Sequence, residues 1–324
     1  GSEMCIRDRV MPPMATEKSA KGQVTDGLIA YYGDMARSGP GLIIQEHSFV
    51  SPDGRASANQ VSLAADADIP GLQRLTAAVH AQGVPILAQI SHAGSAAHRA
   101  ITGQEVISAS AVPNPSRAAS VHGQPEFPRE MTQGDIQCII QAFVDAAARA
   151  QQAGYDGVEI HSAHGYLLDQ FYSPLTNRRT DDYTGRTLEG RTRLQVEIIH
   201  AIRRRLGKDF VLSLRLGGSD YMDGGAVCAE VGQAAKLFEA AGLDMLSLSG
   251  GMSFFFRPGH TEAGYFAELA EAAKTGTTLP VMLTGGIADG AEAETFLEKG
   301  QADLIGIGRA ALRDHQIYQK ILSM

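Results

Sequence analysis

Short runs of apolar residues alternate along this chain with longer segments in which apolar positions recur every three or four residues. An unbroken apolar run is typical of a strand buried on both faces, and the longer spacing is typical of a helix packed on a sheet. The pattern predicts strands at Val10–Met14, Leu42–Glu46, Ile86–Ile90, Gly157–His161, Phe210–Leu216, Met245–Ser249, Val281–Thr284 and Leu304–Ile307. It predicts helices near 27–37, 69–82, 133–153, 189–206, 229–241, 263–274, 290–299 and 309–321.

Eight strands, each followed by a helix, favour a closed barrel over an open sheet. No linker or shift in composition divides the chain, so we predict a single-domain (β/α)8 TIM barrel over residues 9–324. Residues 1–8 carry no periodic pattern and begin with Gly1-Ser2, so we interpret them as a tag remnant or a non-native leader. Two connections, Ser91–Met131 and Gly250–Thr261, are longer than a barrel needs and follow strand ends, where active-site loops belong.

The composition narrows the class of partner. The 324 residues carry a formal net charge of −8 without a lysine- or arginine-rich run, which argues against nucleic acid or an anionic membrane as a partner. No apolar stretch reaches the roughly 18 residues of a membrane helix. The cysteines, Cys5, Cys138 and Cys228, lie far apart, so we expect no disulfide framework and no metal site. A cytoplasmic protein that acts on a small molecule fits these properties.

Two histidines and a tyrosine, His161, His164 and Tyr166, follow the end of one predicted strand within six positions. Such a place at the mouth of a barrel is typical of catalytic residues. Two imidazoles can hydrogen-bond to one substrate oxygen, and a phenol can donate a proton to carbon. The alternatives are that these side chains satisfy local backbone groups, or that the histidines bind a metal, for which the sequence offers no evident third ligand.

Glycines follow the last two predicted strands, in Thr284-Gly285-Gly286-Ile287 and in Gly306-Ile307-Gly308-Arg309. Glycines let backbone N–H groups approach an anion, a helix N-terminus favours negative charge, and Arg309 adds a charged donor. Phosphate sites of barrels often lie after strands seven and eight. The two segments together therefore predict a phosphate site, although glycines can also serve tight turns alone.

Gln89 and Arg215 are polar residues inside otherwise apolar strands. Burying an amide or a guanidinium without a partner is costly, so each needs a ligand or an internal partner. A polar ligand at the barrel centre, such as a pyrimidine edge, would supply one. An ion pair of Arg215 with Glu159 or Glu46 is the alternative.

Six segments match, in order, the motifs of a known family: Val10–Met14, Ala88–Gly94, Gly157–Tyr166, Ser173–Arg179, Leu283–Gly286 and Ile307–Arg309. With them the chain resembles the old yellow enzyme family of NAD(P)H:flavin oxidoreductases, the ene-reductases, over nearly its whole length. Ser173-Pro-Leu-Thr-Asn-Arg-Arg179 is especially specific, because this run at this spacing is hard to obtain by chance in another barrel.

The resemblance implies one noncovalent FMN, with Gln89 and Arg215 at its pyrimidine part and Gly286, Gly308 and Arg309 at its phosphate. The full set of residues that it assigns to the cofactor is Pro13, Met14, Ala15, Gln89, Arg215, Ser249, Gly250, Gly285, Gly286, Gly308 and Arg309. It assigns Thr16, His47, Phe254 and Arg257 to the substrate pocket.

The resemblance also implies a ping-pong reaction. NADPH or NADH gives a hydride to the flavin and leaves, and an α,β-unsaturated substrate then takes that hydride at its β-carbon. His161 and His164 would hold the activating oxygen of the substrate, and Tyr166 would protonate the carbon next to it. The preference for NADH or NADPH and the natural substrate are open, and a homo-oligomer is possible.

The chain departs from the family at two positions near the expected flavin. Ala15 follows Met14 where Cys or Thr is common, and His47 stands where smaller residues are common. One alternative is therefore a flavin-binding protein without efficient turnover. Others are a dienoyl-CoA reductase-like enzyme that lacks its cluster segment, and a non-flavin barrel lyase or isomerase acting on a sugar phosphate.

Overall fold

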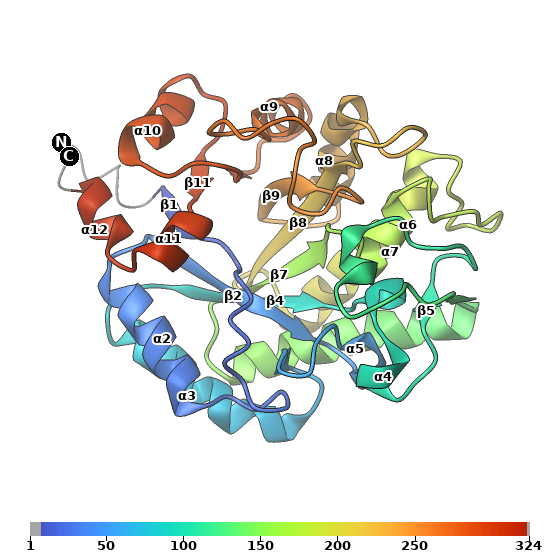
Figure 1. The fold of residues 1–324 in the computed structure, drawn as a ribbon, viewed down its shortest axis with the longest axis horizontal. Helices are drawn as coiled ribbons and strands as arrows, with labels where there is room; N and C mark the ends of the chain where they lie inside the picture. Colours follow the sequence, from blue (N-terminus) through green and yellow to red (C-terminus); the bar gives the residue numbers. More distant parts are fainter. Residues whose placement is uncertain (1–7, 323–324) are drawn as a thin grey trace.

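Eight parallel strands close into a barrel in the computed structural model, which describes residues 8–322 (Figure 1). They are β1 (Arg9–Met11), β2 (Leu42–Phe49), β4 (Ile86–Ser91), β7 (Gly157–Ser162), β8 (Val211–Ser219), β9 (Met245–Gly250), β10 (Val281–Leu283) and β11 (Leu304–Gly306). Each strand pairs with the next, and β1 pairs with both β11 and β2, which closes the ring. The predicted (β/α)8 barrel is confirmed. The sequence predicted a tag remnant or leader at residues 1–8, and residues 1–7 of it lie outside the described part of the chain.

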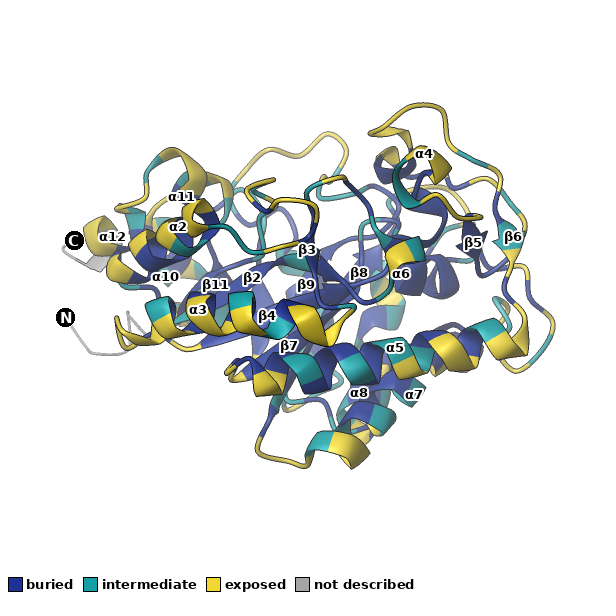
Figure 2. Cartoon of the chain, turned by 90° about the horizontal axis from the view of Figure 1, so that it is seen from below, coloured by how far each residue is buried: buried dark blue, intermediate teal, exposed yellow. Residues whose placement is uncertain are grey.

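Helices surround the barrel, and Figure 2 shows buried strands behind helices with one buried and one exposed side. The main helices are α2 (Asp26–Arg37), α3 (Ile69–His80), α5 (Gln133–Gln152), α7 (Leu188–Leu206), α8 (Val231–Ala240), α9 (Ala267–Lys274), α10 (Gly290–Glu298), α11 (Arg309–Arg313) and α12 (Ile317–Leu322). Their apolar faces and the outer faces of the strands form the main hydrophobic core. Among the described residues, no helix is long and apolar enough to cross a membrane.

The interior of the barrel changes from apolar to polar along its axis. A small cluster contains Val10, Ile44, Leu87, Met245 and Met282, which come from five different strands and can therefore meet only inside the ring. Side chains two positions apart point to the same side of a strand, so Gln89 lies above Leu87 toward the carboxyl end. The apolar cluster thus forms a floor beneath a polar layer.

Three expected boundaries differ from the observed ones for local reasons. β1 ends at Met11 because Pro12 and Pro13 have no N–H group to continue the ladder. The helix expected at 263–274 begins only at Ala267, after Gly264 with a φ of 70°. The helix expected at 309–321 is divided into α11 and α12, because Asp314 is extended and its carboxylate accepts the backbone N–H of Gln316 at 3.0 Å.

The long connection after β4 has structure of its own. It contains the short helix α4 (Arg99–Thr102) and a separate two-stranded sheet of β5 (Ile107–Ser108) and β6 (Arg129–Glu130). A further short helix, α6 (Leu167–Tyr172), follows β7 and was not expected from the sequence. These elements lie at the carboxyl ends of β4 and β7 and bring polar side chains to the barrel mouth.

Candidate active site

One cavity of about 810 Å³ lies at the carboxyl ends of the strands, a volume typical of small-molecule sites. Most of the residues expected from the sequence line it, which are Pro13, Met14, Ala15, His47, Gln89, His161, His164, Tyr166, Arg215, Ser249, Phe254, Gly285, Gly286, Gly308 and Arg309. Both long connections reach it as expected, the first with Val121 and His122 and the second with Phe254 and Phe255.

His161, His164 and Tyr166 lie together on one side of the cavity. The ring of His161 is 5.0 Å from the rings of both His164 and Tyr166, measured between centroids. His161 is the fifth residue of β7, whereas His164 and Tyr166 lie in the turn before α6. His164 has a φ of 63°, an uncommon conformation for a non-glycine residue that is often found at functional sites.

The turn that carries these side chains is held by two neighbouring segments. The backbone N–H of His164 donates to the carbonyl of Gly250 at the end of β9. Asn114 Nδ2 donates to the carbonyl of Gly165 at 2.9 Å, and Ser116 Oγ donates to the carbonyl of His164 at 3.3 Å. The long connection therefore fixes the position of the histidine pair as well as lining the cavity.

Both histidines are neutral in this setting. Burial lowers the pKa of His161 well below its usual value, and the nearby His164, His47 and Arg215 lower it further. Burial likewise lowers the pKa of His164, which lies 2.7 Å from the Ser249 hydroxyl through Nε2. Burial raises the pKa of the Tyr166 phenol, which therefore keeps its proton. The trio offers neutral hydrogen-bond donors and a protonated phenol.

Beneath this trio lies the polar layer. Gln89 Nε2 donates to Glu159 Oε1 at 2.8 Å, and Ser213 Oγ donates to Glu159 Oε2 at 3.3 Å. Among the described residues, Arg215 Nη2 makes two long contacts, each of 3.4 Å, to the hydroxyls of Ser249 and Thr284. No carboxylate of the described residues forms an ion pair with Arg215, so the ion-pair alternative is not realised.

Arg215 is only partly satisfied by the protein. Its Nε is buried and has no hydrogen-bond partner among the described residues. Burial lowers the pKa of the Arg215 guanidinium, an effect that the nearby Glu159 opposes. A buried donor without a partner is costly, and an acceptor on a ligand in the cavity would remove that cost.

The glycine segments form the other end of the cavity. Gly285 and Gly286 have φ angles of 112° and 75°, which confirms that they serve a tight turn. A Cβ on Gly286 would lie 2.5 Å from the carbonyl oxygen of Glu262, and one on Gly308 would lie 2.7 Å from Met14 Sδ. Only glycine fits at Gly286, where the clash is with backbone and φ is positive, whereas the flexible end of the Met14 side chain can move away from a Cβ at Gly308. The backbone of both segments faces a space that Arg309 also lines.

Three expected residues are not brought to the cavity wall. The Thr16 hydroxyl donates to Glu46 Oε1 at 3.1 Å, and Arg257 forms an ion pair with Glu268 at 2.9 Å. Gly250 accepts the N–H of His164 and lies behind the cavity lining. These residues lie near the cavity in the sequence, but they form hydrogen bonds or ion pairs with neighbouring residues and do not line the cavity.

Several cavity residues were missed from the sequence. Tyr265 lies between the glycine segments and accepts a hydrogen bond from Arg309 Nη2 at 3.1 Å, yet it was placed in a helix that begins two residues later. Glu17 also lines the cavity and had no sequence signal of its own. Thr284 lines it too; it stood in the predicted phosphate segment but was not named as a site residue.

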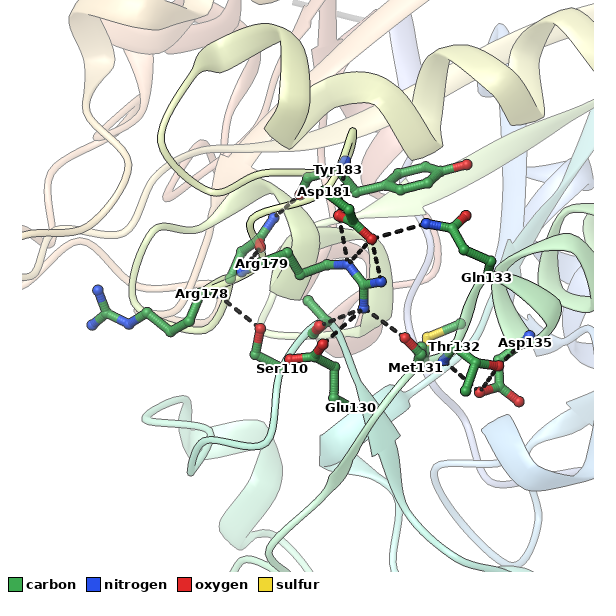
Figure 3. Close-up of polar contacts among 12 residues, drawn as sticks. Ser110, Glu130, Met131, Thr132, Gln133, Asp135, Arg178, Arg179, Asp181 and Tyr183 are labelled. Carbon is green, nitrogen blue, oxygen red and sulfur yellow. Dashed lines mark hydrogen bonds and ion pairs between the residues drawn. The ribbon is translucent and has the colours of Figure 1, made fainter.

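Arg179, a buried arginine that does not line the cavity, anchors the long connection (Figure 3). Arg179 Nη1 donates to the carbonyls of Ala109 and Met131, at 3.0 and 2.6 Å, and Arg179 also pairs with Asp181 at 2.6 Å. The two carbonyls directly follow β5 and β6, which are parallel, so one guanidinium joins the carboxyl ends of both strands of the small sheet. Arg179 is the last residue of the most specific family motif.

Comparisons with known proteins agree with this geometry. The profile of the NADH:flavin oxidoreductase / NADH oxidase family matches residues 1–323. The NADH oxidase of Thermoanaerobacter brockii is 41% identical over 319 residues, which is 96% of this chain and 48% of that protein. The NADPH dehydrogenase of Bacillus subtilis (strain 168) is 36% identical over 315 residues, which is 96% of this chain and 89% of that protein. A solved complex of 2-naphthoyl-CoA reductase with 2-naphthoyl-CoA has a TM-score of 0.89 at 28% identity, covering 98% of this chain and 50% of that one.

The family relationship extends over the whole barrel. This chain spans about half the length of the NADH oxidase and most of the length of the NADPH dehydrogenase. The profile match and both identities place the motifs of the candidate site within a shared family, whose members use FMN with NADH or NADPH. The chain belongs to the NADH:flavin oxidoreductase / NADH oxidase family, and within it to the old yellow enzyme relatives that its motifs resemble.

Proposed function

We propose that this barrel is an ene-reductase, which uses NADPH or NADH to reduce activated C=C bonds of α,β-unsaturated carbonyl compounds. The observation that carries this proposal is the neutral histidine pair beside a protonated phenol, all three on the wall of one cavity. The pair can bind a neutral carbonyl oxygen without an ionic partner.

The residues of the cavity fit FMN. The unpartnered Nε of Arg215 supplies a donor for an acceptor on the isoalloxazine ring, and Gln89 keeps its carbonyl oxygen after Nε2 has bound Glu159. Gly286, Gly308 and Arg309 would hold the phosphate with backbone N–H groups and a guanidinium. Bound FMN supplies hydride transfer from the nicotinamide to the substrate.

The side chains around the cavity bind the substrate and donate the proton. His161 and His164 hold the activating oxygen of the substrate and stabilise negative charge that develops on it. Tyr166 donates its phenolic proton to the carbon next to the activating group. Phe254 and Phe255, whose ring centroids lie 4.4 Å apart, line the cavity together with Ala15, and these apolar side chains exclude water.

The Tyr166→Phe variant tests this assignment. We expect reduction of the bound flavin by NADPH to stay within about twofold of wild type, because the phenol has no role in that step. We expect reoxidation by an enone to slow by about 10²–10⁴-fold, the usual contribution of a positioned proton donor. Stopped-flow absorbance separates the two half-reactions. Tyr183→Phe, whose hydroxyl donates to Glu197 away from the cavity, is the matched control.

Two outcomes would contradict the proposal. Equal slowing of both half-reactions would make Tyr166 a residue that positions the cofactor. A chain that releases no FMN on denaturation, and takes none up when FMN is added, would not be a flavoenzyme.

Reduction of an unsaturated CoA thioester is the second candidate. It is favoured by the likeness to 2-naphthoyl-CoA reductase and by the length of the NADH oxidase, of which this chain spans about half. Cinnamaldehyde and cinnamoyl-CoA carry the same unsaturated skeleton and differ in the activating group, an aldehyde or a CoA thioester. A comparison of their kcat/KM values therefore distinguishes the two candidate functions. A higher kcat/KM for the thioester, with iron and sulfide found in the intact protein, would favour the second one.

A further inference from the structure

The hydrogen bonds around His47 fix the position of its ring proton. Gln60 Oε1 accepts the backbone N–H of Ala56 at 2.7 Å. Because a backbone N–H can only donate, this contact identifies the oxygen end of the amide. Gln60 Nε2 is therefore an NH₂ group, which lies 3.1 Å from His47 Nδ1, 3.2 Å from Ser91 Oγ and 3.4 Å from the carbonyl of His47. The shortest of these contacts directs an N–H of the amide at Nδ1, which accepts it. A neutral imidazole that accepts at Nδ1 carries its proton on Nε2.

His47 is thus a neutral donor on the wall of the cavity. Burial lowers the pKa of His47 to about 4, although the nearby Glu17 opposes the shift. At neutral pH the ring is uncharged, and with Nδ1 occupied it offers one N–H group. Its Nε2 makes no hydrogen bond with another described residue, and the ring lines the cavity.

An irregularity in β2 brings His47 to this position. Gln45 pairs with Ala88 and Ser48 pairs with Ile90, so β2 has one residue more than β4 between the two pairs. Such a bulge redirects the side chains that lie on it, and His47 is one of them. The ring of His47 lies 6.4 Å from that of His161 and 5.6 Å from that of Tyr166, measured between centroids.

The number of donors exceeds what one carbonyl oxygen can accept. A carbonyl oxygen has two lone pairs, which His161 and His164 occupy under the proposed function. A third donor needs a second acceptor. We propose that His47 is a third hydrogen-bond donor to the substrate, and that it selects unsaturated substrates whose activating group carries two oxygens over those with one carbonyl oxygen. This inference rests on the proposed function.

Two probes with one styryl skeleton test it: trans-β-nitrostyrene, with two oxygens on the activating group, and trans-cinnamaldehyde, with one. We compare kcat/KM for both, with NADPH, in wild type and in His47→Phe, which keeps an aromatic ring and removes the N–H. We expect the nitro-to-aldehyde ratio of kcat/KM to fall by about tenfold, the size of one neutral hydrogen bond.

Two further variants control for packing. His47→Gln restores the polarity, because its carbonyl can accept from Gln60 and its NH₂ can donate into the cavity, so it should keep most of the ratio. His200→Phe makes the same exchange on the exposed side of α7 and should leave the ratio unchanged. The FMN content of each variant verifies that it is folded.

The outcomes are distinguishable. Equal slowing of both probes in His47→Phe, or a ratio that does not change, would overturn the role of His47 and leave the proposed function standing. Wild-type protein that binds FMN and reduces neither probe would overturn the proposed function, and the inference with it. ¹⁵N-histidine NMR gives an independent measurement: the signal lost in His47→Phe should show a protonated Nε2, and a protonated Nδ1 would overturn the inference.

Discussion

At the scale of single residues, Glu46 is a buried carboxyl group whose ionisation lowers the stability of the folded protein. Burial raises the pKa of Glu46 to about 7, although hydrogen bonds from Thr16 and Tyr32 partly oppose the shift. The folded protein therefore keeps a proton on Glu46 at a pH where the unfolded chain has released it. Glu46 lies beside His47 on the irregular part of β2, where its carboxylate accepts hydrogen bonds from Thr16 and from Tyr32 of α2.

This shift predicts a pH dependence of stability. Between pH 4.5 and about 7 the folded state binds the extra proton, so the free energy of unfolding falls as the pH rises, by about 3 kcal/mol in total from this group. The glutamine in Glu46→Gln cannot ionise. Between pH 5 and pH 8 the free energy of unfolding of this variant should therefore fall by about 3 kcal/mol less than that of wild type. Urea unfolding at both pH values measures the difference, with the exposed Glu298→Gln as the control. An unchanged pH dependence in Glu46→Gln would contradict the assignment.

At the scale of elements, Arg179 connects a sequence motif to the active-site loop. The sequence identified both the motif and the long connection but not the bond between them, because that bond joins residues about 50 to 70 positions apart. Strand and helix positions were predictable from local periodicity, whereas the place of Thr16 and Arg257 depended on partners elsewhere in the chain. Gln60, which orients His47, had no local signal for the same reason.

Removing the Arg179 guanidinium should loosen this connection. Arg179→Ala leaves two buried carbonyls, of Ala109 and Met131, without their charged donor, at a cost of about 1–3 kcal/mol. We expect faster hydrogen exchange over residues 106–131 and a higher KM for the unsaturated substrate, with FMN still bound. Arg178→Ala is the matched control, because the Arg178 side chain is exposed and only its backbone N–H bonds to Ser110 (Figure 3). Equal exchange in the two variants would show that the loop does not depend on Arg179.

At the scale of the whole molecule, the barrel is closed by a narrow seam. β1 has three residues and pairs with β11 through two residue pairs, Arg9 with Ile305 and Val10 with Gly306. The closed ring was predictable because eight apolar runs with eight helices leave few other arrangements. β1 itself ends before two prolines, and the same prolines begin the segment that lines the cavity.

FMN should therefore strengthen the seam more than the rest of the barrel. Pro13 and Met14 extend from β1, and Gly308 and Arg309 extend from β11, so a cofactor bound between them would connect both sides of the closure. A ligand that binds only the folded state raises the free energy of unfolding by about 2.7 kcal/mol at a concentration one hundred times its Kd. The N–H of Ile307 donates to the carbonyl of Val10 across the seam, whereas α7 does not line the cavity. We therefore expect added FMN to slow hydrogen exchange over residues 304–308 far more than over α7. In Arg309→Ala the same protection should require a higher concentration of FMN, because a charge-assisted phosphate contact is lost. Protection that is equal over both segments would show that FMN stabilises the barrel as a unit, and the seam would then have no special dependence on the cofactor.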